Sequence, residues 1–282
     1  MTLKFTILGC GSSGGVPRLA LGWGDCDPGN PKNRRRRTSL LVERRGSHGI
    51  TRVLVDTSPD VREQLLEAEV DSLDAVLFTH AHADHTHGID DLRGFVIKHR
   101  RRVDVYADES TAAALRARFG YCFRSPPGSE YPPILSEHRL EAGRAENIAG
   151  AGGAITALPL LQQHGNIQSL GFRFGCFAYS CDLSDLPSAS IAALEGVDVW
   201  VVDALRYRPH PSHFSVEDAL SWIDRIKPKR AILTNLHYDL DFGRLSAQLP
   251  PHVEPAYDGL SIEVECRARS SQGTRASAHS LT

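Results

Sequence analysis

The segment at residues 78–88, with the sequence FTHAHADHTHG, constrains this chain more than any other part of it. It follows a short apolar run that predicts a buried strand. His80 and His82 are two positions apart, so in an extended chain their imidazoles leave on the same side. Asp84 and His85 follow where the backbone is expected to turn. Four ligands therefore converge at the carboxyl end of one strand, and nitrogen and oxygen donors without a thiolate favour a hydrolytic zinc, manganese or iron site.

Further ligands are needed, because two cations about 3.5–4 Å apart require more donors than one loop supplies. A solvated His-rich loop is the alternative, but with 13 histidines in 282 residues the pattern arises by chance in roughly one of a thousand such sequences. His164, Asp182 and His237 each follow an apolar run expected to be a strand. Each alone fits a loop histidine or a helix cap, whereas together with the cluster they complete a ligand set.

Composition sets the broad class of the chain. With 282 residues, 41% hydrophobic and 23% charged, it can bury a sizeable core, and its net charge of -2 favours neither nucleic acid nor membrane surfaces. No apolar run approaches the roughly eighteen residues of a membrane span. The six cysteines form no Cys-x-x-Cys pair, and the N-terminus shows no secretory pattern, so we expect free thiols and a cytoplasmic protein.

Strand-like and helix-like segments alternate along the chain, which predicts an α/β fold with helices on both sides of the strands. The expected strands lie near residues 3–8, 38–43, 52–56, 74–79, 103–106, 154–161, 169–174, 176–181, 197–202, 230–234 and 260–265. The expected helices lie near residues 59–68, 110–119, 188–194 and 216–226, with Ser110 and Ser215 as caps of the second and the last. Residues 120–153 are expected to form a long ordered loop, with a lid as one interpretation, and residues 267–282 a disordered tail after a hydrolase domain at 1–266.

Two further segments allow a functional or a purely structural interpretation. Ser12, Ser13 and Gly14 lie in a glycine-rich turn, where the backbone can approach an anion or simply make a tight turn. The run from Arg34 to Arg37 is either a solvated face or a rim that attracts an anionic substrate.

These motifs resemble those of the metallo-β-lactamase superfamily over about residues 3–266. The resemblance implies a four-layer αββα sandwich with two divalent cations, zinc or manganese, at one edge of its two sheets. It also implies that His80, His82 and His164 hold the first cation and Asp84, His85 and His237 the second, with Asp182 bridging both.

Within the superfamily the chain is most similar to the phosphoribosyl cyclic phosphate phosphodiesterases of bacterial phosphonate degradation. The similarity rests on the ligand loop and on the segments GIDDLR at 88–93, DALR at 203–206, PHPSH at 209–213 and AYDGL at 256–260. Two departures stand out. The loop after the glycine turn offers only Cys26, so we expect no third, structural zinc. Asn235 stands where those enzymes usually have histidine, so His237 is displaced by two positions from the expected ligand. Either a differently shaped loop delivers His237 to the second cation, or Asn235 or water completes its ligand set.

The resemblance implies a phosphodiesterase that acts on a small cyclic phosphate or nucleotide, such as a 5-phosphoribosyl 1,2-cyclic phosphate, through a metal-bridging hydroxide. Asp84 would orient that hydroxide. His213 would protonate the leaving group as general acid, with His210 as the local rival. Ser12, Ser13, Gly14, Arg206 and His210 are the candidate substrate-binding residues.

Three other functions stay open at this point: an RNA 3′-processing nuclease, a thioester or lactam hydrolase, and a non-catalytic metal-binding module. The near-neutral charge weakens the nuclease interpretation, because phosphate neutralisation dominates nucleic-acid binding. We therefore expect a small phosphate ester or nucleotide as partner, no membrane and no stable nucleic-acid complex. A homodimer remains an open alternative.

Overall fold

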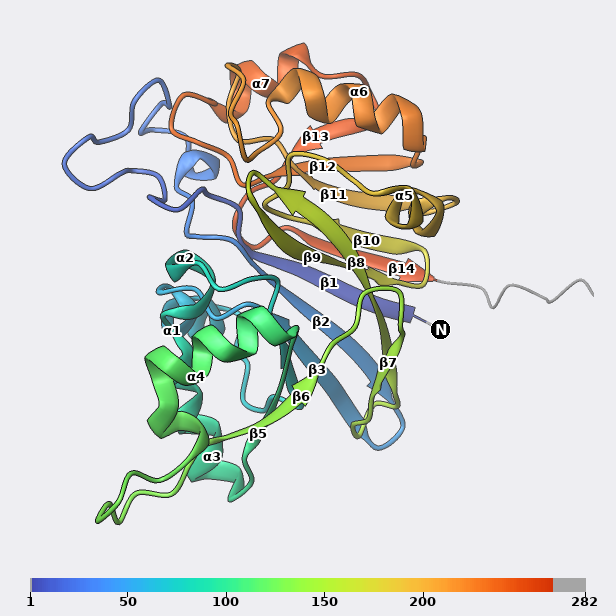
Figure 1. Cartoon of the computed structure of the whole chain (residues 1–282). Coiled ribbons are helices and arrows are strands. Elements are labelled where there is room, and N and C mark those ends of the chain that lie inside the picture. Colours follow the sequence, from blue (N-terminus) through green and yellow to red (C-terminus); the bar gives the residue numbers. More distant parts are fainter. Residues whose placement is uncertain (1, 266–282) are drawn as a thin grey trace, which may run out of the picture.

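The computed structural model describes residues 2–265, and the expected tail at 267–282 lies outside the described residues. Two seven-stranded sheets pack face to face, with strand orders β14-β1-β2-β3-β4-β5-β6 and β13-β12-β11-β10-β9-β8-β7 (Figure 1). The first sheet consists of β1 Thr2–Gly9, β2 Ser39–Gly46, β3 Gly49–Val55, β4 Ala75–Leu77, β5 Val103–Ala107, β6 Leu135–Arg139 and β14 Ser261–Glu265. The second consists of β7 Glu146–Ile148, β8 Ile155–His164, β9 Ile167–Phe174, β10 Phe177–Ser180, β11 Val199–Asp203, β12 Arg230–Thr234 and β13 Val253–Pro255.

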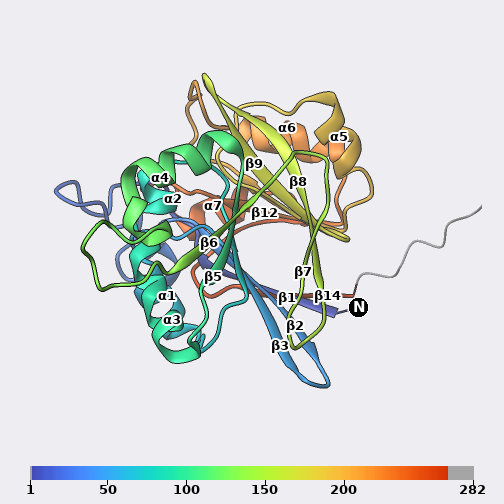
Figure 2. The same cartoon turned by 60° about the horizontal axis from the view of Figure 1, so that its bottom comes forward.

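Helices cover the outer face of each sheet (Figures 1 and 2). The first sheet carries α1 Val61–Glu67, α2 Ala83–Thr86, α3 Arg93–His99 and α4 Glu109–Phe123, with the 3-10 turn η2 Ile89–Leu92 between α2 and α3. The second carries α5 Ser188–Leu194, α6 Val216–Ile226 and α7 Phe242–Gln248, and the turn η1 Pro31–Asn33 lies in the loop before β2. The layers run helix, sheet, sheet, helix, so the predicted αββα architecture is confirmed.

Three apolar clusters hold these layers together. The cluster between the sheets includes Phe5 and Phe177, whose rings stack across the interface. A second cluster packs Trp200 under the helices of the second sheet, and a third packs Phe78 under those of the first. Burial of each such side chain contributes about 1.5–3 kcal/mol to stability. The two sheets are therefore held firmly against each other, and their strands can support a site at the sheet edge.

Strand direction places the chemically important residues at one edge. β3, β4, β5 and β6 run parallel to one another, and so do β10, β11, β12 and β13. Parallel strands bring their carboxyl ends to the same edge. Asp56, His80, Asp182, Asp203 and Asn235 stand at or just beyond such ends, so segments far apart in the chain meet at one place.

Several local expectations differ from the structure. The long loop expected at 120–153 is wrong, because this segment contains the end of α4 together with β6 and β7. Both strands are short and largely exposed, so they lack the apolar alternation that marks a strand. Asp108, and not Ser110, caps α4 by accepting a hydrogen bond from the Thr111 N–H at 2.7 Å. The expected cap of α6 is confirmed, since Ser215 forms a full capping box.

Of the five cysteines between residues 2 and 265, four follow the expectation of free thiols. These four, Cys10, Cys26, Cys122 and Cys181, are free and buried. Cys176 is disulfide-bonded, so the expectation is wrong for this residue. Between residues 2 and 265, no helix combines the length and the apolarity that a membrane crossing requires.

Candidate metal centre

The histidine loop turns as its sequence suggests. His80 and His82 follow β4, and α2 begins at Ala83 directly after the extended backbone of His82. That helical turn carries Asp84 and His85 back toward the same point. His80 and His85 are 1% and 0% exposed, so the imidazoles face the interior of the site and not solvent.

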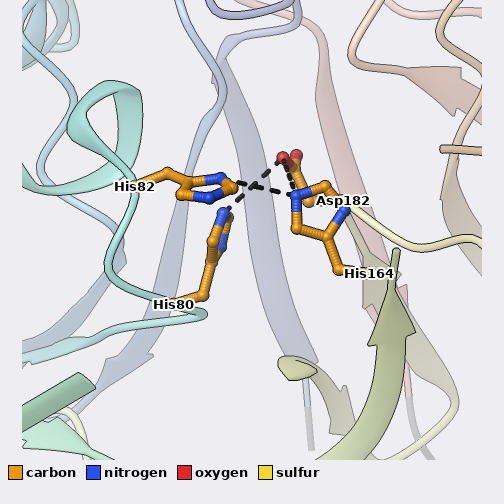
Figure 3. A group of neighbouring side chains, drawn as sticks. All are labelled: His80, His82, His164 and Asp182. Atoms are coloured by element: carbon orange, nitrogen blue, oxygen red, sulfur yellow. Dashed lines mark hydrogen bonds and ion pairs between the residues drawn. The ribbon is translucent and has the colours of Figure 1, made fainter. Parts of the chain in front are cut away.

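Four ligand atoms surround one point (Figure 3). One carboxylate oxygen of Asp182, Oδ2, lies 3.7 Å from Nε2 of His80 and 3.6 Å from Nε2 of His164. Nε2 of His164 lies 3.4 Å from Nδ1 of His82. All four ligand atoms lie within 4.8 Å of one another, which is the compact four-donor arrangement that zinc prefers.

Asp182 also faces a second group of donors with its other oxygen. Its Oδ1 lies 3.4 Å from Nε2 of His85, and the same nitrogen lies 3.4 Å from Oδ2 of Asp84. One carboxylate thus has an oxygen toward each candidate position, as a bridging ligand requires. Cys181 is close as well, but its Sγ donates to Oδ1 of Asp182 at 2.8 Å, and burial raises the pKa of the thiol well above its usual range.

The buried nitrogens fit a cation. Among the described residues, Nε2 of His80 and Nε2 of His85 are buried and have no hydrogen-bond partner. A buried polar atom without a partner costs about 1–3 kcal/mol, and coordination would remove that cost. Burial lowers the pKa of His80 well below its usual range, which keeps it in the neutral form that binds metals. Burial alone would raise the pKa of Asp182, but His85 and His80 hold it well below its usual range.

A second layer of hydrogen bonds fixes the imidazoles. Nδ1 of His85 lies 2.7 Å from Oδ2 of Asp56. The Thr79 hydroxyl donates to the same oxygen at 2.8 Å and lies 3.0 Å from Nδ1 of His80. Nδ1 of His164 lies 2.6 Å from the Ser212 carbonyl. Such bonds orient the ring so that its other nitrogen faces the cation.

Sequence reasoning did not identify Asp56 or Ser212 as part of the site. The signal for Asp56 was available, because it follows an apolar strand directly, as Asp182 does. Ser212 acts through its backbone carbonyl, and a backbone contact leaves no mark in the residue type.

His213 and Asp203 form a separate pair beside the ligands. Nδ1 of His213 lies 2.8 Å from Oδ2 of Asp203, which also accepts the Leu183 N–H at 3.2 Å. Burial alone would lower the pKa of His213, but Asp203, with smaller contributions from Asp182 and Asp84, raises it to about 9. His213 therefore carries a proton at neutral pH, and its ring lies 4.7 Å from that of His164.

One cavity of about 320 Å³ contains both parts of the site. Four of the five expected substrate-binding residues line it, namely Ser12, Ser13, Arg206 and His210. Gly14 does not, but a Cβ there would lie 2.5 Å from the Arg18 side chain. Because Gly14 has no side chain, the Arg18 side chain can pass it and line the cavity.

His237 lines this cavity but is not among the grouped ligand atoms. Its Nε2 lies 3.1 Å from Nη1 of Arg18, and its Nδ1 lies 3.1 Å from Oδ1 of Asp239. Asn235 is nearer the ligands, since its Nδ2 donates to Oδ1 of Asp182 at 3.0 Å. The other six expected ligands meet at the two positions described above.

The family to which the chain belongs follows from its sequence match. The model of the beta-lactamase superfamily domain matches residues 51–238, a range that contains every expected ligand. The chain belongs to the β-lactamase superfamily. The expectations of the metallo-β-lactamase fold and of a hydrolase of this superfamily agree with that result.

Two solved structures resemble this chain over more than nine-tenths of its length. The crystal structure of a diphosphatase from the PhnP family is 34% identical with a TM-score of 0.85, and the match covers 94% of this chain and 98% of that one. Zinc-bound PqqB from Methylobacterium extorquens is 15% identical with a TM-score of 0.72, covering 92% and 99% of the two chains, and so shows the fold alone.

A longer relative carries a different name. An octanoyltransferase of Porphyromonas gingivalis is 34% identical over 267 residues, which are 93% of this chain and 52% of that protein. The chain therefore spans about half the length of this relative, and the name applies to the whole of the longer protein.

Proposed function

We propose that this protein is a metal-dependent phosphodiesterase that acts on a small phosphate ester, with cyclic phosphates and nucleotides as the substrate class. The observation that carries the proposal is the Asp203–His213 pair, which presents a proton donor to the cavity that holds the ligand atoms. Alkoxide leaving groups need such a donor, because they are strong bases. The 34% identical diphosphatase of the PhnP family supports a phosphorus-containing substrate.

Four groups that line the cavity would each have a part in this reaction. Divalent cations held by the two ligand sets would supply a water of lowered pKa and neutralise charge on phosphoryl oxygens. Asp84 lines the cavity and would orient the attacking water. His213 would give its Nε2 proton to the leaving oxygen. The guanidinium groups of Arg18 and Arg206 on the cavity wall would attract the anionic substrate.

The other functions receive less support. Thioester hydrolysis expels a thiolate, which is a weak base and gains little from a proton donor such as His213. Acyl transfer through Cys181 is disfavoured, because this thiol is buried and its raised pKa keeps it protonated. A tRNA substrate calls for extensive positive charge, whereas the chain has a net charge of -2. A small substrate and a cytoplasmic location remain our predictions.

A substrate panel tests the proposal. Zinc- or manganese-loaded protein would be assayed with bis-p-nitrophenyl phosphate, a five-membered ribosyl cyclic phosphate, a dinucleotide with a diphosphate bridge, nitrocefin and a lactoyl thioester. We expect turnover of one or more of the three phosphate substrates. Turnover confined to nitrocefin or the thioester would overturn the phosphodiesterase proposal.

The Asp203→Asn substitution should move the alkaline limb of the pH–kcat profile. Because Asp203 raises the pKa of His213 to about 9, the acid form dominates below that pH and is lost as pH rises through it. Without the carboxylate, burial favours the neutral imidazole, so the limb should fall to or below the ordinary histidine pKa of about 6.5. An alkyl phosphodiester would be assayed across this range.

A matched control comes from another histidine–aspartate pair in the same region. Asp239 contacts Nδ1 of His237 at 3.1 Å, so Asp239→Asn should leave the limb where it is in the parent protein. A limb that stays near pH 9 in Asp203→Asn would contradict the role given to the Asp203–His213 pair.

A further inference from the structure

The two candidate cation positions have unequal ligand sets within residues 2–265. The first has four donors from four side chains, His80, His82, His164 and Asp182. At the second, Nε2 of His85 lies between carboxylate oxygens of Asp84 and Asp182, each 3.4 Å away. These are three donors, and Asp182 is shared with the first position. The Cys181 thiol also lies within 4.8 Å of the ligand atoms of His85 and Asp182.

Asn235 stands where a fourth donor of the second position would be. It follows β12, lines the cavity and is 2% exposed. Its Nδ2 donates at 3.0 Å to Oδ1 of Asp182, the oxygen that also faces His85. The amide therefore presents N–H to this place and not a lone pair, and a neutral amide oxygen is in any case a weaker ligand for zinc than imidazole.

Neither of the nearby alternatives replaces the missing donor. Both ring nitrogens of His237 have partners, Arg18 on one side and Asp239 on the other, at 3.1 Å each. The guanidinium of Arg18 adds a positive charge where a cation would have to approach that imidazole. Cys181 belongs to the core between the sheets, and its Sγ donates to Asp182.

We infer that the centre binds two divalent cations with unequal affinity, one resident and one exchangeable. The four-donor position retains its cation, whereas the position at Asp84 and His85 exchanges its cation with solution because Asn235 supplies no strong ligand. The inference rests on the proposed function, since it concerns the same pair of positions. It adds that activity depends on the concentration of free cation.

The backbone at Asn235 permits a direct test. Its φ is 62°, in the left-handed region, which asparagine, aspartate and histidine adopt more readily than other non-glycine residues. Asn235→His is therefore expected to fold and to offer the imidazole that the second position lacks. Asn235→Ala removes the amide without adding a donor, and His237→Ala removes the residue that the sequence suggested as ligand.

The experiment measures metal content and affinity in the full chain. After dialysis against metal-free buffer, we expect the parent protein to keep about one zinc ion per chain. Titration of the metal-free protein with Mn²⁺, followed by electron paramagnetic resonance, should show a second affinity at least about tenfold weaker than the first, because losing even a supporting residue of a ligand costs roughly 10–100-fold in metal affinity. Asn235→His should tighten the second affinity by at least about tenfold. Asn235→Ala removes the hydrogen bond to Asp182 and adds no donor, so it should not tighten the second affinity. His237→Ala and Cys181→Ser should leave it unchanged.

Two results would overturn the inference. One is a parent protein that keeps two zinc ions after the same dialysis. The other is a weaker second affinity in His237→Ala or Cys181→Ser, which would identify a fourth ligand. If circular dichroism shows that Asn235→His does not fold, the stoichiometry of the parent protein still decides. Metal content and affinity do not depend on the substrate, so they would still test this inference if the phosphodiesterase proposal failed. Conversely, phosphodiester turnover at saturating cation would still support the phosphodiesterase proposal if the two affinities proved equal.

Discussion

The His213→Ala substitution should lower kcat on an alkyl phosphodiester by about 10²–10⁴-fold, the usual contribution of a general acid. The expected cause is the loss of the imidazolium proton that His213, paired with Asp203, would donate to the leaving group in the cavity at neutral pH. Asp203 keeps that proton in place by raising the pKa of His213 to about 9. An alkoxide that leaves without a proton is a poor leaving group, so the full loss should appear on such substrates.

The leaving group separates this role from a structural one. A p-nitrophenolate leaves readily without a proton, so bis-p-nitrophenyl phosphate should lose much less kcat than the alkyl diester. Metal content should stay at the parent level, because His213 is outside the grouped ligand atoms. His210→Ala is the matched control, since its ring lies 5.0 Å from that of His213 and it was the rival candidate. Equal kcat of parent and His213→Ala on the alkyl diester would exclude the general acid role.

How far the sequence predicts this site depends on whether a residue acts through its type or through its surroundings. His80 and His82 were identifiable because their two-residue spacing in a strand brings both imidazoles to one side. Asp182 was identifiable because an acidic residue directly after a buried strand stands at a sheet edge. The four-layer architecture came from the resemblance of these motifs to a family, since the alternation of strands and helices predicted only an α/β fold.

The features that the sequence missed or left open share a physical reason. Whether His237 reaches a cation depends on the partners of its ring nitrogens, and Arg18 lies 219 residues away in the chain. Asp203 was noticed only as part of a family motif, because its role arises from the 2.8 Å contact with His213. The short strands β6 and β7 are held by pairing with longer neighbours, and pairing of this kind leaves little pattern in the strand itself.

The Asp182→Ala substitution should deplete both cation positions and abolish most turnover. Oδ2 of Asp182 faces His80 and His164, and Oδ1 faces His85, so one truncation removes a donor from each set. The loss of metal affinity should exceed the 10–100-fold that changes of supporting residues cause. Mass spectrometry of metal content after dialysis would measure it, and full occupancy at both positions would refute the bridging role.

Two further variants separate the loss of ligation from damage to the backbone. Asp182 has a φ of 55°, which costs alanine roughly 1 kcal/mol, so part of any change in Asp182→Ala could be strain. Asp182→Asn keeps the shape and tolerates this conformation, yet it loses the negative charge that offsets two cations. We expect it to bind metal nearly as poorly as Asp182→Ala while unfolding at a higher temperature. Asp185→Ala, an exposed carboxylate outside the cavity lining, should retain the metal content of the parent protein.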